Sequence, residues 1–203
     1  RSLRSDLNKF KMLRVLDIEK YQFNGKIGKS LGKLRHLRYL SLKRSDLRKL
    51  PTSIADLPCL QTLDLRDCEL DTIPNVLWKI KSLRHLYLHD LIRPGEELLR
   101  LDGLSKLEVL ETLHTRLFDV KDLFKLANLW RVKAVIKVKF EEELVDLINY
   151  LAHIATKLRY SSFLVEYKFS SPAELNLLEQ LIQCQHLNTL QIHGVVSKLP
   201  EHH

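Results

Sequence analysis

Apolar residues recur along this chain in a fixed pattern, with members at offsets 0, 3, 6 and 8 from the start of each copy. The clearest copies are Phe10, Leu13, Leu16 and Ile18; Leu34, Leu37, Leu40 and Leu42; Leu57, Leu60, Leu63 and Leu65; Ile80, Leu83, Leu86 and Leu88; and Cys184, Leu187, Leu190 and Ile192. The third position of the pattern falls at Leu16, Leu40, Leu63, Leu86, Leu110 and Val132, and successive third positions are 22 to 24 residues apart. Such a period indicates a repeat protein.

Each repeat is predicted to hold one short strand and one irregular or helical return. The last two apolar positions are two residues apart, which is the period of a strand, whereas the leading offsets of three suit a looser turn. A single repeat cannot bury its own apolar face, so neighbouring repeats must stack, about 4.8 Å apart. The sequence therefore predicts an α/β solenoid of about eight repeats, with a curved parallel β-sheet on its concave side.

The period loosens after Val132, where the pattern predicts a longer strand. Residues 131–140 alternate between a core-facing and a solvent-facing set. The core-facing set is Val132, Ala134, Ile136, Val138 and Phe140, and the solvent-facing set is Arg131, Lys133, Val135, Lys137 and Lys139. Residues 161–169 are predicted to form another strand, whose facing the pattern leaves open.

Two amphipathic helices are predicted in the later returns. Three acids at 141–143 suit the positive end of a helix, and its apolar stripe is Leu144, Leu147, Leu151 and Ile154. Ser171, Pro172 and Glu174 are typical of a capped helix start, followed by an apolar stripe of Leu175, Leu178 and Ile182. We expect one repeat domain over residues 1–203, with regular repeats at about 10–140, longer helical returns at about 141–183 and a final repeat at about 184–203.

The composition excludes several classes of protein. Leucine accounts for 44 of 203 residues, and glycine and proline for six each, so the chain is neither collagen-like nor of low complexity. No apolar run approaches the roughly 18 residues that span a membrane. The cysteines, Cys59, Cys68 and Cys184, lack the spacing of a disulfide framework or zinc site, and no asparagine begins a glycosylation signal. Both features favour a cytoplasmic protein. A start at Arg1, without Met or a signal peptide, is expected for a piece of a longer chain.

Several segments resemble the leucine-rich-repeat domain of plant intracellular immune receptors of the coiled-coil, nucleotide-binding class. They are LRVLDIE (13–19), LGKLRHLRYLSLKRSDLRKLPTSIADLPCLQTLDLRDCELDTIP (31–74), LWKIKSLRHLYL (77–88) and HLNTLQIHGVVSKLP (186–200). Leu-Pro or Ile-Pro after the strand, at 50–51, 73–74 and 199–200, and Cys68 at the turn are similar to that family's consensus.

The resemblance implies that this domain restrains a receptor at rest and contributes to recognition of a pathogen effector, or of a host protein that the effector targets. It also implies an upstream nucleotide-binding domain, which would hold the nucleotide, so no cofactor is expected in this domain. In such receptors the first repeats face that domain. Lys43, Arg44 and Arg66 lie in these repeats among few acids, and we expect them to dock an acidic patch of the nucleotide-binding domain.

No catalytic or metal-binding motif is complete in the sequence, and we expect no enzyme activity. Residues 25–30 end in Gly-Lys-Ser as phosphate-binding loops do, but Phe23 stands where that motif needs glycine. His85 and His89 are four apart in a predicted strand, about 13 Å along it, so they cannot share a metal ion. Cys68 is expected to be a turn residue that bonds the next repeat. The net charge of +8 is dispersed and no nucleic-acid module is present, so we expect no nucleic-acid binding.

The concave face of the sheet is the predicted partner-binding surface, because residues that flank the buried apolar residues of each strand point to solvent. The candidates are Tyr39, Lys43, Arg66, His85, Tyr87, His89, Arg131, Lys133, Gln191 and His193. Val15, Asp17, Glu19, Ser41, Thr62, Asp64 and Thr189 are expected on the same face. Aromatic and arginine side chains are frequent anchors of binding surfaces.

Two other functions fit a repeat domain of this kind. A secreted receptor ectodomain would be indicated by a transmembrane segment elsewhere in the gene, although paired-cysteine caps and glycan sites are lacking in this sequence. A substrate adaptor of a ubiquitin ligase would be indicated by an upstream F-box segment. An upstream phosphate-binding loop would instead indicate the immune receptor.

Overall fold

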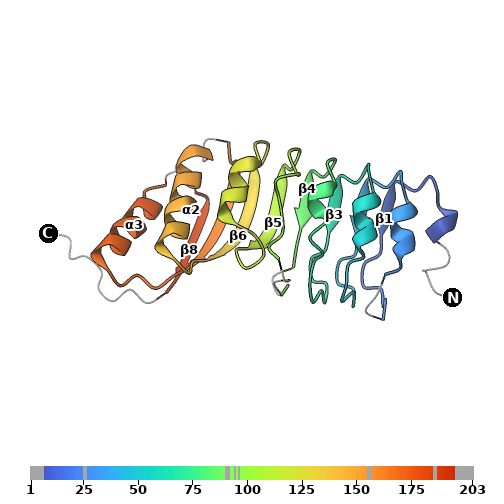
Figure 1. Ribbon diagram of the computed structural model, residues 1–203, viewed down its shortest axis with the longest axis horizontal. Coiled ribbons are helices and arrows are strands. Elements are labelled where there is room, and N and C mark those ends of the chain that lie inside the picture. Colours follow the sequence, from blue (N-terminus) through green and yellow to red (C-terminus); the bar gives the residue numbers. More distant parts are fainter. Residues whose placement is uncertain are drawn as a thin grey trace.

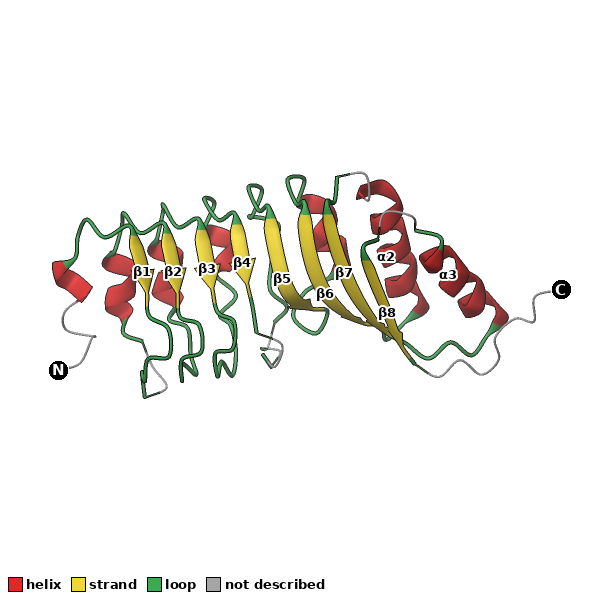
Figure 2. Cartoon of the chain, turned by 180° about the vertical axis from the view of Figure 1, so that it is seen from behind, coloured by secondary structure: helices red, strands yellow, loops and turns green. Residues whose placement is uncertain are grey.

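Eight strands form one parallel sheet in the computed structural model, which describes residues 7–24, 27–89, 92–93, 95, 97–154, 157–184 and 187–194. The strands are β1 (Val15–Asp17), β2 (Tyr39–Ser41), β3 (Thr62–Asp64), β4 (His85–Tyr87), β5 (Val109–His114), β6 (Arg131–Lys137), β7 (Tyr160–Glu166) and β8 (Thr189–His193). They lie side by side in sequence order, with β1 and β8 at opposite ends of an elongated molecule (Figure 2). The predicted parallel solenoid is confirmed.

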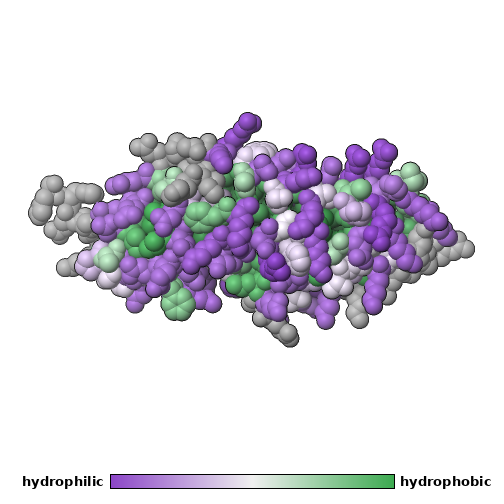
Figure 3. Space-filling view, turned by 45° about the horizontal axis from the view of Figure 1, so that its top comes forward, coloured by the Kyte–Doolittle hydropathy of each residue, from purple (hydrophilic) through white to green (hydrophobic). Residues whose placement is uncertain are grey.

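The helical returns all lie on one side of the sheet (Figure 1). They comprise the short 3-10 helices η1 (Leu7–Lys9), η2 (Lys29–Lys33), η3 (Thr52–Asp56), η4 (Leu77–Lys79) and η5 (Val120–Lys125), and the α-helices α2 (Glu141–Ile154) and α3 (Pro172–Ile182). Hydrophilic side chains cover most of the surface in Figure 3, so the apolar repeat positions are left to the interior between sheet and returns.

The predicted anchor residues lie at one level of adjacent strands. Leu16 pairs with Leu40, Leu40 with Leu63, Leu63 with Leu86, Leu86 with Leu110 and Leu110 with Val132. From Leu40 to Val132, each anchor is at most 1% exposed. Burying one such side chain stabilises the fold by roughly 2 kcal/mol. This column of aliphatic residues therefore fixes the register of the strands, because a shift by one residue would turn every anchor to solvent.

The turns after β2 and β3 are tied to one carbonyl group. Arg44 and Asp67 have left-handed backbone angles, each with φ of 57°. The next residues, Ser45 and Cys68, both donate to the Leu42 carbonyl oxygen, over 2.5 Å and 2.8 Å. The prediction that Cys68 bonds the next repeat is therefore wrong. Its side chain bonds the preceding repeat, because it reaches back to the end of β2. Burial raises the pKa of the Cys68 thiol, which fits a structural role.

Both predicted α-helices are confirmed, and each packs one apolar side on the core. Leu144, Leu147 and Leu151 of α2 are buried, as are Leu178 and Leu181 of α3. None of the helices in the described part of the chain is long and apolar enough to cross a membrane.

Two residues assigned to the core by these patterns are exposed. Phe140 is 65% exposed, because β6 ends at Lys137 and the chain turns away from the sheet before α2 begins. Ile182 is 61% exposed, because Leu178 and Leu181 form the inward side of α3 and Ile182 ends the helix beyond them.

Phe10, predicted as the first apolar member of its repeat, is half exposed because no strand stacks outside β1 among the described residues. Other assignments lie outside the described residues. They concern the Gly-Lys pair at 25–26, the side chain of Ile154, the Leu-Pro pair at 199–200 and the final histidines at 202–203.

The start of α3 holds Glu174 in a cluster of donors. The Tyr167 hydroxyl and the Ser170 and Ser171 N–H groups each donate to its carboxylate over 2.7 Å. The Ser171 hydroxyl accepts from the Glu174 N–H, which completes the predicted capping box. The donors, led by Tyr167, lower the pKa of Glu174 to about 2, and the same hydrogen bond raises the pKa of Tyr167 to about 12.

Glu174 should make the stability of the fold sensitive to acid. Because folding lowers the pKa of Glu174 from its ordinary 4.5 to about 2, its contribution is complete above pH 4.5 and is lost as the pH falls toward 2. We expect Glu174→Gln to reduce this loss of stability when urea unfolding is measured between pH 4.5 and about 2. The control is Glu179→Gln, which changes an exposed acid of the same helix. An acid response of Glu174→Gln identical to that of the unaltered chain would contradict the prediction.

Candidate functional site

The face of the sheet away from the helical returns is open, and two rows of side chains cross it. Residues at equal levels of neighbouring strands lie next to each other on such a face. The first row is Val15, Tyr39, Thr62, His85, Val109, Arg131 and Tyr160, and the second is Asp17, Ser41, Asp64, Tyr87, Glu111, Lys133, Ser162 and Thr189. These rows, with the outward residues that follow them along each strand, are termed the concave face.

Arg66 is fixed on the concave face by a carboxylate and an aromatic ring. Its guanidinium donates to both Asp64 oxygens, with Nη2 2.6 Å from Oδ2 and Nε 3.0 Å from Oδ1. Its Cζ lies 4.6 Å from the ring centroid of Tyr87, which is a cation–π distance. Hydrogen bonding to Asp64 raises the pKa of Arg66. The guanidinium is therefore charged and held in one orientation.

Arg131 repeats this arrangement farther along the sheet. Its Nε donates to the Glu111 carboxylate, and its Cζ lies 4.2 Å from the ring centroid of Tyr160. Tyr87 pairs with Glu111 in the second row and joins the two arrangements. Burial, and then the charge of Glu111, raise the pKa of the Tyr87 hydroxyl. The continuous set of Asp64, Arg66, Tyr87, Glu111, Arg131 and Tyr160 is termed the Arg–aromatic stripe.

A hydroxyl, an imidazole and a carboxylate also meet on this face. Thr62 Oγ1 lies 2.9 Å from His85 Nδ1, and the Glu108 carboxylate lies 3.8 Å from His85 Nε2. The Glu108 distance exceeds that of a hydrogen bond, and Glu108 instead accepts from Arg84 over 2.9 Å. The carboxylate thus does not orient the imidazole as in a hydrolase triad. The described residues contain no group of three or more potential metal ligands.

The structure brings some of the predicted partner-binding residues together and separates others. Arg66, His85, Tyr87 and Arg131 gather over β3 to β6, where Lys133 lies beside Glu111. Tyr39 and Lys43, at β2, are partly buried and lie apart from this group. Gln191 and His193 are exposed and lie on the end strand β8. His89 follows β4 and is partly buried. The compact part of the predicted surface is therefore its centre.

Two residues expected to point into solvent lie on the concave face but are buried. Ser41 and Asp64 are each only 3% exposed. Ser41 is short and stands between Asp17 and Asp64 in the second row. The Arg66 side chain binds the Asp64 carboxylate and covers it. Larger neighbours thus exclude water from positions that the strand period alone assigns to the surface.

Sequence reasoning missed Glu108, Glu111 and Tyr160. Glu111 follows the anchor Leu110 just as Tyr87 follows Leu86, so the repeat spacing contained the signal. Tyr160 begins the strand whose facing the pattern left open. Glu108 precedes β5, where the strand period gives no information.

A bulge in β5 changes the sheet at its middle. The pairing of β5 with β6 shifts register between Glu111 and Leu113, and Thr112 between them has a φ of 64°. That backbone angle is rare for a β-branched residue. Strands before the bulge have three residues, whereas β6 and β7 have seven. The bulge therefore separates the regular repeats from those with longer strands.

The three predicted docking cations differ in their surroundings. Arg44 pairs with Glu19 at 3.1 Å and with Asp67 at 3.5 Å, and Arg66 pairs with Asp64. The Lys43 side chain has no ion-pair partner among the residues that the structure describes. Glu19 and Asp67 lie in the repeats on either side of Arg44, and Asp64 lies two residues before Arg66. Counting the acids close to each arginine in the sequence therefore understates how far its charge is neutralised.

Comparison with known families and sequences gives matches along the whole chain. The family described as "Leucine-rich repeat region" matches residues 1–202. The Arabidopsis thaliana protein named "Probable disease resistance protein RXW24L" is 39% identical over 127 residues, covering 62% of this chain and 14% of that protein. "Probable disease resistance protein At1g59620", from the same plant, is 30% identical over 197 residues, covering 95% of this chain and 22% of that protein. The chain thus spans less than a quarter of the length of these relatives.

Solved structures with the same fold are more distant in sequence. The ectodomain of the Arabidopsis receptor kinase HAESA, solved with the peptide hormone IDA and the co-receptor SERK1, matches with a TM-score of 0.58 and 20% identity, over 94% of this chain and 31% of that one. A leucine-rich-repeat protein of Leptospira interrogans matches with a TM-score of 0.56 and 20% identity, over 94% of this chain and 57% of that one. At this identity the likeness concerns the fold alone.

Proposed function

Because the chain belongs to the leucine-rich-repeat family, we propose that it is the protein-binding module of a cytoplasmic plant immune receptor. Its concave face contributes to recognition of a pathogen effector, or of a host protein that the effector targets. The relatives named as disease resistance proteins support the setting in plant defence. The module binds and does not catalyse, since repeat scaffolds of this kind present surfaces for partners.

The Arg–aromatic stripe is the observation that carries the proposal. Arginine and tyrosine are enriched among residues that dominate binding energies. Both arginines of the stripe are already held by a carboxylate and a ring, so they lose little freedom when a partner binds. Ordering a free side chain of this kind costs about 0.5–1.5 kcal/mol, which a fixed side chain avoids. The stripe is therefore suited to contact the acceptor groups and flat surfaces of a protein partner.

Restraint of the receptor at rest is the second part of the proposal. The early repeats dock the nucleotide-binding domain of the same receptor, which would hold the nucleotide, and Lys43, Arg44 and Arg66 face its acidic patch. Lys43 contributes most, because the other two are neutralised within the chain. A rim charge of this kind alters association more than folding. Reversal of Lys43 and Arg66 to Glu would accordingly cause cell death in the absence of pathogen, or loss of signalling, at normal protein abundance.

Recognition by the stripe is tested by replacing Arg131 in a receptor that carries this chain. Arg131→Ala should weaken partner binding by about 2 kcal/mol, roughly 30-fold, and reduce pathogen-induced cell death in leaves. The matched control is Arg100→Ala. Arg100 also pairs with an acid, Asp102, and also stacks on a ring, Trp78 at 4.2 Å, but it lies with the helical returns.

Protein abundance is measured alongside the response, so that loss of folding is distinguished from loss of binding. The proposal predicts normal abundance of both variants and a reduced response only for Arg131→Ala. Equal responses of the two variants would count against the concave face as the recognition surface.

A further inference from the structure

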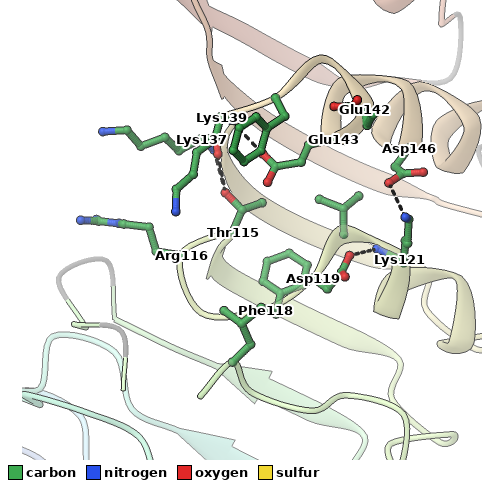
Figure 4. A pocket seen from close by; sticks show the side chains of 13 residues that line it. Thr115, Arg116, Phe118, Asp119, Lys121, Lys137, Lys139, Glu142, Glu143 and Asp146 are labelled. Carbon is green, nitrogen blue, oxygen red and sulfur yellow. Dashed lines mark hydrogen bonds and ion pairs between the residues drawn. The ribbon is translucent and has the colours of Figure 1, made fainter. Parts of the chain in front are cut away.

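A pocket of about 260 Å³ lies where the turn after β5 meets the start of α2 (Figure 4). Phe118 and Val120 line it from the turn and are buried, whereas Leu98 and Phe140 line it with side chains at least half exposed to solvent. None of its lining residues belongs to the Arg–aromatic stripe. The pocket thus offers apolar surface at a place that the Arg–aromatic stripe does not use.

Thr115 holds one wall of this pocket in place. Its hydroxyl accepts from the Lys137 N–H over 2.8 Å and donates to the Lys137 carbonyl oxygen over 3.1 Å. Its own N–H donates to the Val135 carbonyl oxygen over 3.0 Å. These bonds join the turn after β5 to the end of β6. Because the wall is already ordered, a ligand would not have to order it.

Most of the acids that line the pocket are engaged within the chain. Asp119 accepts from the Lys121 N–H over 2.9 Å, and Glu143 accepts from the Lys139 N–H over 2.8 Å. Asp146 forms an ion pair with the Lys121 ammonium at 3.3 Å, on the side of the pocket nearest α2 (Figure 4). Of these three carboxylates, only Asp146 is therefore neutralised by a cation, whereas Asp119 and Glu143 are oriented by backbone N–H groups.

The cations on the other side of the pocket are unpaired. Arg116, Lys137 and Lys139 have no side-chain ion-pair partner in the described part of the chain, and their side chains extend to the same side in Figure 4. Among the described residues, Glu142 is the only lining carboxylate with neither a hydrogen bond nor an ion pair. The lining thus contains four cations and four acids, and its positive charge is concentrated on the side of Arg116, Lys137 and Lys139 (Figure 4).

We propose that this pocket binds an acidic peptide segment of a protein partner, with one apolar side chain in the pocket and carboxylates against Arg116, Lys137 and Lys139. The volume suits a single side chain, because pockets for drug-sized ligands measure about 300–1,000 Å³. Binding removes Leu98 and Phe140 from water and gives the cations opposite charges. The choice of a peptide rests on the proposed protein-binding role, but none of the residues that contact it belongs to the Arg–aromatic stripe.

Three fluorescent pentapeptides test the chemistry on the unaltered 203-residue chain. The first is fluoresceinyl-Asp-Glu-Phe-Glu-Asp-amide; the second has Ser in place of Phe, and the third has Lys and Arg in place of the acids. Fluorescence polarisation should show the first binding at least about tenfold more tightly than either of the others. Its affinity should fall when the salt concentration is raised from about 50 to about 500 mM.

Charge reversal then locates the site. Lys137→Glu combined with Lys139→Glu should weaken binding of the phenylalanine peptide at least about tenfold. Lys106→Glu combined with Lys168→Glu makes the same change of charge at exposed lysines outside the pocket and should leave binding unchanged. Tyr87→Ala should also bind the peptide normally, so a failure of the pocket is distinguishable from a failure of the Arg–aromatic stripe. No binding up to about 1 mM peptide, equal binding of the serine peptide, or an equal loss in the control variant would overturn the proposal.

Discussion

Replacement of Leu86 by alanine should lower the free energy of unfolding by about 2–5 kcal/mol, because it leaves a cavity in a packed core. Leu86 is 1% exposed and stands between Leu63 and Leu110 in the column of anchors. Neither neighbouring repeat can close the gap without losing its own register. Urea unfolding followed by circular dichroism measures the effect.

The next residue in the strand supplies the control. Tyr87 points to the concave face, where it contacts Arg66, and Tyr87→Ala should cost at most about 1 kcal/mol. If Tyr87→Ala were as destabilising as Leu86→Ala, the facing of the strands would be wrong by one residue.

Gly103→Ala should be strongly destabilising although it adds only a single methyl group. A Cβ at Gly103 would lie 1.9 Å from the Trp78 carbonyl oxygen and 2.9 Å from the Lys81 ammonium nitrogen. The first of these atoms belongs to the backbone of the neighbouring repeat, so the repeats would have to move apart. Such overpacking costs about 1–3 kcal/mol, and here the upper part of that range is expected.

Gly95→Ala is the matched control for Gly103→Ala. Its added Cβ would meet only the Glu97 carbonyl oxygen, at 3.7 Å, which is an ordinary contact. In thermal unfolding, the midpoint temperature of Gly95→Ala should therefore stay near that of the unaltered chain. The midpoint temperature of Gly103→Ala should fall by several degrees. Equal midpoints for the two variants would show that the repeats are not packed closely at Gly103.

The core was predictable because its determinants lie within single repeats. The offsets that place Leu40, Leu63 and Leu86 are local, and stacking merely brings equal positions together. The prediction was wrong at Phe140 and Ile182, where a strand or a helix ends and its period no longer decides which way a side chain points.

The candidate site was only partly predictable, because its bonds join different repeats. Arg66 and Tyr87 could be assigned to the concave face from strand period alone. The contact between Arg66 and Tyr87 joins residues 21 positions apart in the sequence. The contact between Arg131 and Tyr160 joins residues 29 positions apart, because the helical return between their strands is longer. The pocket was not foreseen at all, since it depends on the turn after β5 and the outward course of Phe140.

The defence response of Tyr87→Ala tests most directly whether binding uses the concave face of the strands while folding uses their core face. The variant is placed in a receptor that carries this chain, and pathogen-induced cell death is measured at matched protein abundance. A strongly reduced response is expected, because the aromatic centre of the Arg–aromatic stripe is removed while the core around Leu86 is intact. A full response at normal abundance would contradict the proposal that the concave face recognises the partner.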